Sequence, residues 1–189
     1  GVGYDSYSWS TGENTQTIEV TESGNYSVDV VNSETTAIDV TATTSLYTNG
    51  VFDGYSGGDF SIMVDVKLES QGILYQSSSP HATITYSTTC GCSANVGDFN
   101  EPSISFRTWS NGWTVVHIPV SDLDISECIN ITGVYENNTV KLYIDGLLVD
   151  SESGPVQSAS SIDQIGYEGF AGLIDNFSIF NSALSSSDI

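Results

Sequence analysis

The sequence predicts an all-β protein whose main part is a sandwich of two antiparallel sheets. Three observations lead to this prediction. Val, Ile, Thr, Ser and Tyr dominate the chain, almost no helical periodicity appears, and Gly, Asn and Asp interrupt the apolar runs about every eight to fifteen residues. The 189 residues include 39% hydrophobic and 11% aromatic residues, which is enough to build a packed core and argues against disorder throughout.

The first forty-odd residues predict three short strands joined by turns. The expected features are Trp9 as a core anchor, turns at Thr11–Asn14 and Ser23–Asn25, and one face shared by Tyr26, Val28 and Val30. Three strands make an incomplete sandwich with exposed edges. Either the chain is a piece of a much larger protein, the interpretation that we favour and that the abrupt end at Asp188-Ile189 suits, or these strands dock on the second domain or a neighbouring chain. We therefore divide the chain into 1–43, a partial repeat or linker strands, and 44–189, the main domain.

Thr35–Asn49 is expected to form the joint and the first strand of the main domain. The next strand, Asp59–Leu68, alternates strictly and should place one row of side chains inside and the other outside. The inner row is Phe60, Ile62, Val64, Val66 and Leu68, and the outer row is Ser61, Met63, Asp65 and Lys67. A further strand is expected at Gly72–Gln76.

The middle of the chain predicts a hairpin pair, Ala82–Thr88 with Ser103–Thr108, whose long tip carries Cys90 and Cys92. Strands at 115–120 and 129–135 follow. Next comes the alternating strand Val140–Ile144, and Asp145-Gly146 predicts a tight turn into Leu147–Val149 because both residues tolerate a positive φ. After a last strand, Ala183–Ile189 could form a short helical turn.

The second half also resembles the laminin G-like (concanavalin A-like, pentraxin-like) domain in its bacterial form. The matching segments are Gly133–Tyr135, Leu142–Gly146, Gln164–Gly166, Phe170–Phe177 and Asn181–Ser185. Asp59–Leu68 is similar to an early strand of the family, although Asp65 replaces the family's Trp. The resemblance implies a jelly-roll sandwich over 44–189. Residues 4–30 resemble the back half of an immunoglobulin-like (Ig-like) repeat of secreted, multidomain Bacteroidetes proteins, and the front strands of that repeat are missing.

The charge of the chain is strongly negative. It has 24 acidic residues and three basic ones, Lys67, Arg107 and Lys141, for a formal net charge of −21. Such a surface repels phosphate groups, so nucleic acid and anionic membranes are poor partners. It suits solubility in a salty medium, and specific Ca²⁺ sites are a second explanation that stays open. No apolar run approaches the ~20 residues of a membrane span, and any signal peptide would lie outside this sequence.

Cysteine usage suggests an oxidising compartment. Cys128 is expected to pair with Cys90 or Cys92, which suits an extracellular or cell-surface location. The third thiol would be free or a vicinal alternative. A zinc site is disfavoured because Cys90-Gly91-Cys92 is too short for a zinc knuckle and lacks nearby His.

No catalytic constellation is predicted, and we expect a protein that is not an enzyme. Related jelly-roll glycosidases carry closely spaced acids on one strand, whereas the nearest acids here, Asp122, Asp124 and Glu127, lie in a loop-like stretch. His81 follows a proline, and His117 alternates with apolar residues, which favours a packed or edge histidine over a general base.

One metal site is expected. Asp175 interrupts an apolar strand, where a carboxylate is destabilising unless it is neutralised, and few cationic side chains are available. The resemblance points the same way, because the last-strand Asp of many jelly-roll relatives helps to bind a structural Ca²⁺ that the first-strand region completes. Here that region is Asn49–Gly54. We expect Ca²⁺ at Asp175 and Asp53, and an outward, solvated Asp175 is the alternative.

A ligand surface is expected where aromatic residues occupy polar loops. Tyr55, Trp109 and Trp113 would stack on a sugar ring while Asn111 bonds hydroxyl groups. Alternatively, both tryptophans cap the core, or Asn111-Gly112 is simply a hairpin turn that places the tryptophans on its two flanks.

Together these features predict a non-catalytic, extracellular binding or adhesion module of a larger cell-surface protein. Its partner would be a glycan or a surface protein, and Ca²⁺ would support the fold. The alternative is a structural subunit of an extracellular filament or surface layer, assembled by self-association through the N-terminal strands.

Overall fold

The computed structural model describes residues 6–21, 23–31, 37–41, 46–47, 57–78, 81–88, 99–157 and 163–189. The chain divides into two compact units, Gly1–Thr36 and Ala37–Ile189. The all-β prediction is confirmed, since the described residues contain strands and a single 3-10 turn, η1 (Val120–Asp122). Within those ranges, no helix has the length and apolar character needed to cross a membrane.

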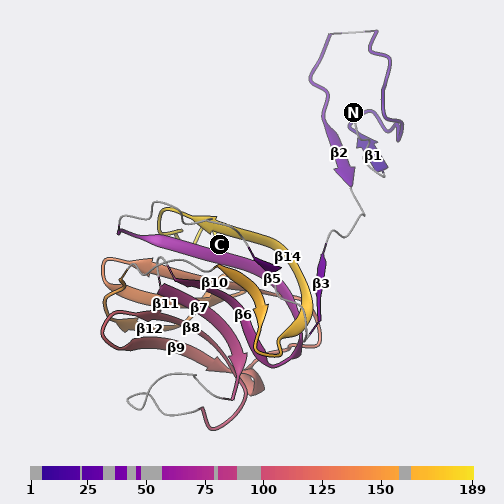
Figure 1. The fold of residues 1–189 in the computed structure, drawn as a ribbon. Coiled ribbons are helices and arrows are strands. Elements are labelled where there is room, and N and C mark those ends of the chain that lie inside the picture. Colours follow the sequence, from indigo (N-terminus) through magenta and orange to yellow (C-terminus); the bar gives the residue numbers. More distant parts are fainter. Residues whose placement is uncertain are drawn as a thin grey trace. The chain divides into compact units, whose positions relative to one another are not determined.

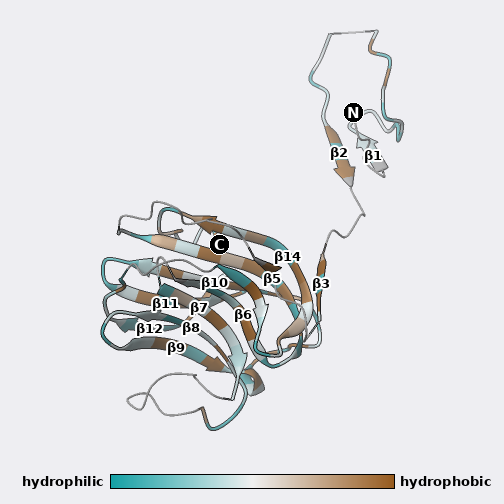
Figure 2. Cartoon of the chain, viewed as in Figure 1, coloured by the Kyte–Doolittle hydropathy of each residue, from teal (hydrophilic) through white to brown (hydrophobic). Residues whose placement is uncertain are grey.

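The first unit contains a two-stranded antiparallel sheet of β1 (Ser6–Trp9) and β2 (Val28–Val31). Val28 and Val30 are 36% and 39% exposed on β2, which is drawn largely in the hydrophobic colour in Figure 2. The indole N–H of Trp9 donates to the Thr15 carbonyl at 2.8 Å. Trp9 is only half-buried, and none of the residues from 7 to 30 whose burial the structure describes is buried, so the prediction of a Trp9 core anchor is wrong for this part of the chain. The Ig-like assignment stays a prediction.

The second unit is a sandwich of two six-stranded antiparallel sheets, which overlap as two layers in Figure 1. Sheet 1 has the order β12-β11-β10-β5-β14-β3, and sheet 2 has the order β4-β13-β6-β7-β8-β9. Sheet 1 consists of β3 (Ile38–Val40), β5 (Phe60–Ser70), β10 (Ile129–Glu136), β11 (Thr139–Ile144), β12 (Leu147–Ser153) and β14 (Ala171–Phe180). Sheet 2 consists of β4 (Leu46–Tyr47), β6 (Gly72–Ser78), β7 (His81–Ser87), β8 (Ser103–Trp109), β9 (Trp113–Pro119) and β13 (Gln164–Tyr167).

The start of this unit is β3, which pairs with β14 through Val40 and Gly172. The strand β3 therefore lies within the expected joint Thr35–Asn49. It precedes residue 44, the predicted start of the main domain. Val40 is 1% exposed and belongs to the core of the sandwich. The sandwich thus draws on residues that we had assigned to the N-terminal segment.

The core lies between the two sheets, and β5 supplies its inner row as predicted. Phe60, Ile62, Val64, Val66 and Leu68 are all at most 7% exposed. Phe60 meets Phe106 of β8 edge to face, with ring centroids 6.4 Å apart, and this contact joins sheet 1 to sheet 2. Burial of such side chains stabilises a fold by roughly 1.5–3 kcal/mol each, so this row is a major source of stability.

The hairpin predicted at Asp145-Gly146 is confirmed. Asp145 has φ 49° and Gly146 has φ 77°, the left-handed pair that a two-residue turn between twisted strands requires. The Asp145 carboxylate also accepts a hydrogen bond from Asn130 N–H at 2.8 Å, and Asp145 N–H donates to the Asn130 carbonyl. The turn is therefore tied to β10 as well as to its own strands.

The C-terminal residues 181–189 form a strap on the outer side of sheet 1. The Ser61 hydroxyl donates to the Ser182 carbonyl at 3.0 Å and accepts from Leu184 N–H at 2.8 Å. The far end of the strap reaches Gly146, where an added Cβ would lie 3.7 Å from the Ile189 carbonyl carbon. Ser185–Asp188 closes a turn in place of the expected helical turn.

Several outward positions of sheet 1 are buried, and for Ser61 the strap is the reason. Ser61, expected to face out, is 0% exposed, as is Val134, and Tyr143 is 6% exposed. Their rows point away from the core between the sheets, because Ser61 pairs with Val134 and Val134 with Lys141 on the outer side. The prediction of an exposed Ser61 is wrong because a segment far along the chain covers it.

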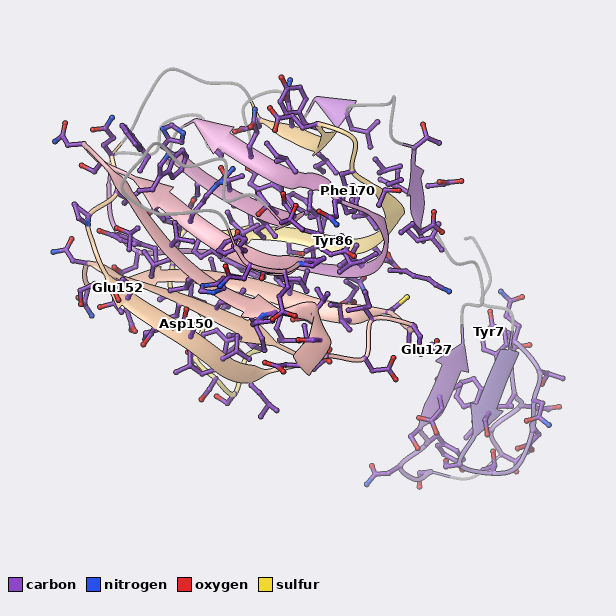
Figure 3. All side chains as sticks on the ribbon, turned by 90° about the horizontal axis from the view of Figure 1, so that it is seen from below. Tyr7, Tyr86, Glu127, Asp150, Glu152 and Phe170 are labelled. Carbon is purple, nitrogen blue, oxygen red and sulfur yellow. The ribbon has the colours of Figure 1, made fainter. Side chains whose placement is uncertain are left out.

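The edges of the two sheets are joined on one side of the sandwich. The His117 N–H of edge strand β9 donates to the Asp150 carboxylate of edge strand β12 at 2.9 Å. Asp150 and Glu152 extend from β12 in Figure 3. This contact satisfies a strand N–H that would otherwise invite pairing with another chain.

Candidate ligand-binding surface

Alternation along β8 and β9 decides which side chains reach the outer side of sheet 2. Phe106 is buried in the core, so its neighbour Arg107 points outward, and Trp109 falls in the same row. Trp113 pairs with Trp109 across the hairpin. These outward residues, together with the neighbouring positions of β6 and β7, form what we call the Arg107 face, comprising Gln71, Ile73, His81, Thr85, Ser87, Ser105, Arg107, Trp109, Trp113 and Glu168.

Three rings form an aromatic cluster at one end of the Arg107 face. Trp109 and Trp113 meet edge to face with centroids 5.1 Å apart, and His81 lies 5.0 Å from Trp113 and 6.1 Å from Trp109. All three are half-buried, so part of each ring is open to solvent. Burial, together with the charge of Arg107, lowers the pKa of His81, so His81 is neutral at neutral pH.

The turn between the tryptophans holds this geometry. Asn111 has φ 57° and is exposed, and Ser110 N–H donates to the Gly112 carbonyl at 3.0 Å. Asn tolerates the left-handed region better than most residues because its side chain hydrogen-bonds locally. The predicted turn that places the tryptophans on its two flanks is therefore confirmed.

Arg107 connects the aromatic cluster to a small pocket. Its guanidinium carbon lies 4.9 Å from the Trp113 ring centroid, within the range of a cation–π contact. The residue is 5% exposed. Burial lowers the pKa of Arg107 to about 10, and the nearby Glu168 opposes that shift, so Arg107 keeps its positive charge at neutral pH.

The pocket beside Arg107 has a volume of about 160 Å³. Its wall contains one cation, one carboxylate and several groups that form hydrogen bonds. The Thr85 hydroxyl, in the wall, lies 2.6 Å from the Ser105 hydroxyl, and Glu168 is held in a turn with φ 52°. The lining residues are Gln71, Gly72, Ile73, Thr85, Ser87, Arg107 and Glu168. A polar pocket next to half-buried rings is suited to reversible binding of a small polar molecule.

A family model described as the concanavalin A-like lectin/glucanases superfamily (Laminin_G_3) matches residues 57–189. The chain belongs to this superfamily. The expected laminin G-like, concanavalin A-like fold is thus confirmed over residues 57–189. These residues make up most of the second unit, Ala37–Ile189, which we call the concanavalin A-like domain. No curated protein is similar enough to count as a relative.

Solved structures share the fold at low sequence identity. The CBM40 of a Ruminococcus gnavus IT-sialidase aligns with TM-score 0.59 and 12% identity over 80% of this chain and 92% of that chain. The binding domain of botulinum neurotoxin DC, solved in complex with SialylT, aligns with TM-score 0.57 and 12% identity over 80% of this chain and 40% of that chain. The protein in a structure titled NanB plus Optactamide aligns with TM-score 0.56 and 16% identity over 80% and 26%. The concanavalin A-like domain therefore corresponds to less than half of the last two chains.

The Arg107 face brings together part of the predicted ligand set. Trp109 and Trp113 are in contact, and Asn111 lies in the turn between them. Neither tryptophan belongs to the hydrophobic core formed by the described residues of the concanavalin A-like domain. Tyr55 lies outside the described residues.

The predicted metal and disulfide residues are only partly described. Asp175 of β14 pairs with Asp65 of β5, so two carboxylates occupy opposite positions of neighbouring strands. Both oxygens of Asp65 accept amide N–H groups at 2.7 Å, from Asn130 and Asn176. Asp53 lies outside the described residues, and among those described no group of three or more His, Cys, Asp or Glu side chains is placed to hold a metal ion.

Cys128 is exposed on the loop before β10. Its expected partners, Cys90 and Cys92, lie outside the described residues, so the pairing stays a prediction.

Asp124 and His117, which the sequence does not predict to be catalytic, have structural contacts. Asp124 accepts hydrogen bonds from the Ser126 hydroxyl and N–H at 2.6 and 3.1 Å, which lowers the pKa of Asp124. His117 stacks on Phe99, with ring centroids 4.6 Å apart, at the edge of sheet 2. The expectation of an edge histidine is confirmed.

Sequence reasoning missed Arg107, His81 and Glu168 as members of the surface. A signal for Arg107 was present, because two-residue alternation places it in the same row as Trp109. Glu168 could not have been found in this way, since it belongs to a turn that reaches the pocket from β13, more than fifty residues later in the chain.

Proposed function

We propose that this chain is a non-catalytic glycan-binding module and that the Arg107 face is its binding surface. The observation that carries the proposal is the contact of two half-buried tryptophans and His81 beside a polar pocket on the outer side of a sheet. Aromatic rings stack on the apolar faces of sugars, while hydroxyl, amide and guanidinium groups bond their oxygens.

The neighbours in structure support this class of function. One is titled as a CBM40 bound to alpha2,3 sialyllactose, and another as a toxin binding domain in complex with SialylT. At 14% and 12% identity they share only the fold, so the proposal for this chain depends on its own residues.

Substitution of the aromatic cluster tests the proposal. Screening of the wild-type chain on a glycan array should yield reproducible saccharide hits. Trp113→Ala should weaken binding to those hits by about tenfold or more, because aromatic stacking surfaces of this type contribute on the order of 1–2 kcal/mol. Tyr86→Phe, which changes a residue packed against the core, is the matched control and should bind normally. A blank array with folded protein would refute the proposal.

We further propose that Ca²⁺ stabilises the domain near Asp175. The support is the opposition of Asp175 and Asp65, because like charges directly across a strand pair repel unless a cation lies between them. Two carboxylates are fewer than the six to eight oxygen ligands of Ca²⁺, so Asp53 or backbone carbonyls would have to complete the site. A melting temperature that is equal in EDTA and in Ca²⁺ at matched ionic strength would refute this part of the proposal.

We also propose an extracellular or cell-surface location, as part of a larger adhesive protein. The support is the acidic composition and the exposed Cys128, which is available for a disulfide. Thiol titration of the denatured, unreduced protein tests it, since a protein exported to an oxidising compartment should show one free thiol for three cysteines.

A second function is favoured by the first unit. Its strand β2 exposes Val28 and Val30 by 36% and 39%, Tyr26 just before the strand is 37% exposed, and an isolated pair of strands is marginally stable in water. Pairing with a neighbouring chain would cover these side chains in a filament or surface layer. Concentration-dependent assembly together with a blank glycan array would favour this function over glycan binding.

A further inference from the structure

We propose that the Arg107 face selects a sugar that carries a carboxylate, and that Arg107 is the residue that binds this group. This inference rests on the proposed glycan-binding function and names the ligand class of the same surface. It predicts a preference for acidic over neutral saccharides in a protein whose own net charge is −21.

The placement of positive charge is the first argument. The chain has three cationic side chains. Lys67 and Lys141 belong to β5 and β11 of sheet 1, and Arg107 belongs to β8 of sheet 2. The Lys141 ammonium is paired with the Glu136 carboxylate, which is a local contact within one hairpin. Arg107, the cation of sheet 2, lines the pocket beside the half-buried rings.

The environment of Arg107 is the second argument. A buried cation is costly unless other groups stabilise it, yet Arg107 is 5% exposed in the outward row of a sheet. The contact with the Trp113 ring and the nearby Glu168 carboxylate both favour the charged form of Arg107. A guanidinium fixed against a ring loses little rotamer freedom when it binds, and its planar fork matches a carboxylate with two parallel hydrogen bonds.

The size of the pocket is the third argument. At about 160 Å³ it is smaller than the roughly 300–1,000 Å³ of pockets that enclose whole drug-sized ligands. It suits one substituent of a sugar, while the ring of that sugar extends toward Trp113 and Trp109. Thr85 and Ser87 also line the pocket, so its wall is polar, as a carboxylate substituent requires.

Glu168 sets the strength of this preference. Its carboxylate lines the same pocket and is exposed. A negative charge at this position competes with an incoming carboxylate for Arg107. Removal of that charge should therefore strengthen binding of acidic sugars and leave neutral sugars unaffected.

Titration calorimetry with two matched pairs of saccharides tests the inference. The pairs are 3′-sialyllactose with lactose, and trigalacturonic acid with galactotriose. In each pair that binds, the acidic member should bind roughly tenfold tighter or more, because a charge-assisted bidentate contact is worth about 1.5–3 kcal/mol. Arg107→Gln should remove the preference, and Glu168→Gln should increase it. Lys67→Gln, which removes one positive charge from sheet 1, should leave it unchanged.

The outcomes separate the two proposals. Equal binding of acidic and neutral members by the wild-type chain, or an intact preference in Arg107→Gln, overturns the inference and leaves glycan binding standing. Failure to bind any saccharide on the array or in solution overturns glycan binding itself. If Arg107→Gln does not fold, Glu168→Gln decides the matter, because its exposed position preserves the fold, and an unchanged acidic preference there overturns the inference.

Discussion

At the scale of single residues, Gly133 shows how closely the two sheets approach. A Cβ built on Gly133 would lie 2.5 Å from two carbons of the Phe106 ring, a distance that real Cβ atoms do not tolerate. Phe106 is itself 0% exposed and packs against Phe60, so it cannot move away without disturbing the core. The glycine is thus required by packing and not by its backbone conformation.

Gly133→Ala should lower the free energy of unfolding by about 1–3 kcal/mol, the usual range for overpacking a well-filled core. Urea denaturation measures the change. Gly112→Ala is the matched control, because a Cβ there would have no atom within 4 Å, and its stability should stay near that of the wild type. A stability loss shared equally by both variants would contradict the packing explanation. Phe106→Leu combined with Gly133→Ala should recover part of the loss.

At the scale of elements, alternation and turn residues predicted the strands well, whereas contacts between residues far apart in the sequence could not be predicted from them. The alternation of β5 and the Asp145-Gly146 turn depend on neighbouring residues, so the sequence pattern was sufficient. The burial of Ser61 depends on Ser182, 121 residues later, and no periodicity of β5 carries that information. The same holds for the site, where alternation places Arg107 beside Trp109 while Glu168 arrives from a distant turn.

The strap provides the prediction at this scale. Ser61→Ala removes the hydroxyl that bonds both Ser182 and Leu184 and should lower the free energy of unfolding by about 1–2 kcal/mol. Urea denaturation measures this loss, and hydrogen exchange should show faster exchange at Leu184 N–H. Ser151→Ala, an exposed position on β12, should change neither quantity. Unchanged exchange at Leu184 would show that the strap is held by other contacts.

At the scale of the whole molecule, charge is the dominant property. A net charge of −21 on 189 residues destabilises the compact state by self-repulsion, and dissolved salt weakens that repulsion. The Debye length falls from about 30 Å at 0.01 M to about 10 Å at 0.1 M ionic strength, so the effect should be largest over that interval.

The melting temperature should therefore rise by several degrees when NaCl increases from about 0.01 to about 0.3 M at pH 7. Scanning calorimetry measures the rise. The control is the same series near pH 4, close to the isoelectric point of about 4.1, where little net charge remains and the salt dependence should disappear. An equal rise at both pH values would point to a salt effect on apolar surface instead of charge screening.

The alternation of β8 has a consequence for how this scaffold can change. Phe106 points into the core between the sheets and Arg107 points to the outer side of sheet 2, so one strand supplies both a core row and the row of the proposed binding surface. If the proposed binding surface is correct, substitutions in the outward row should change ligand preference while the inward row continues to hold the two sheets together. On the same condition, exchange of the outward side chains of β8 offers a way to design binders for other saccharides on an unchanged core.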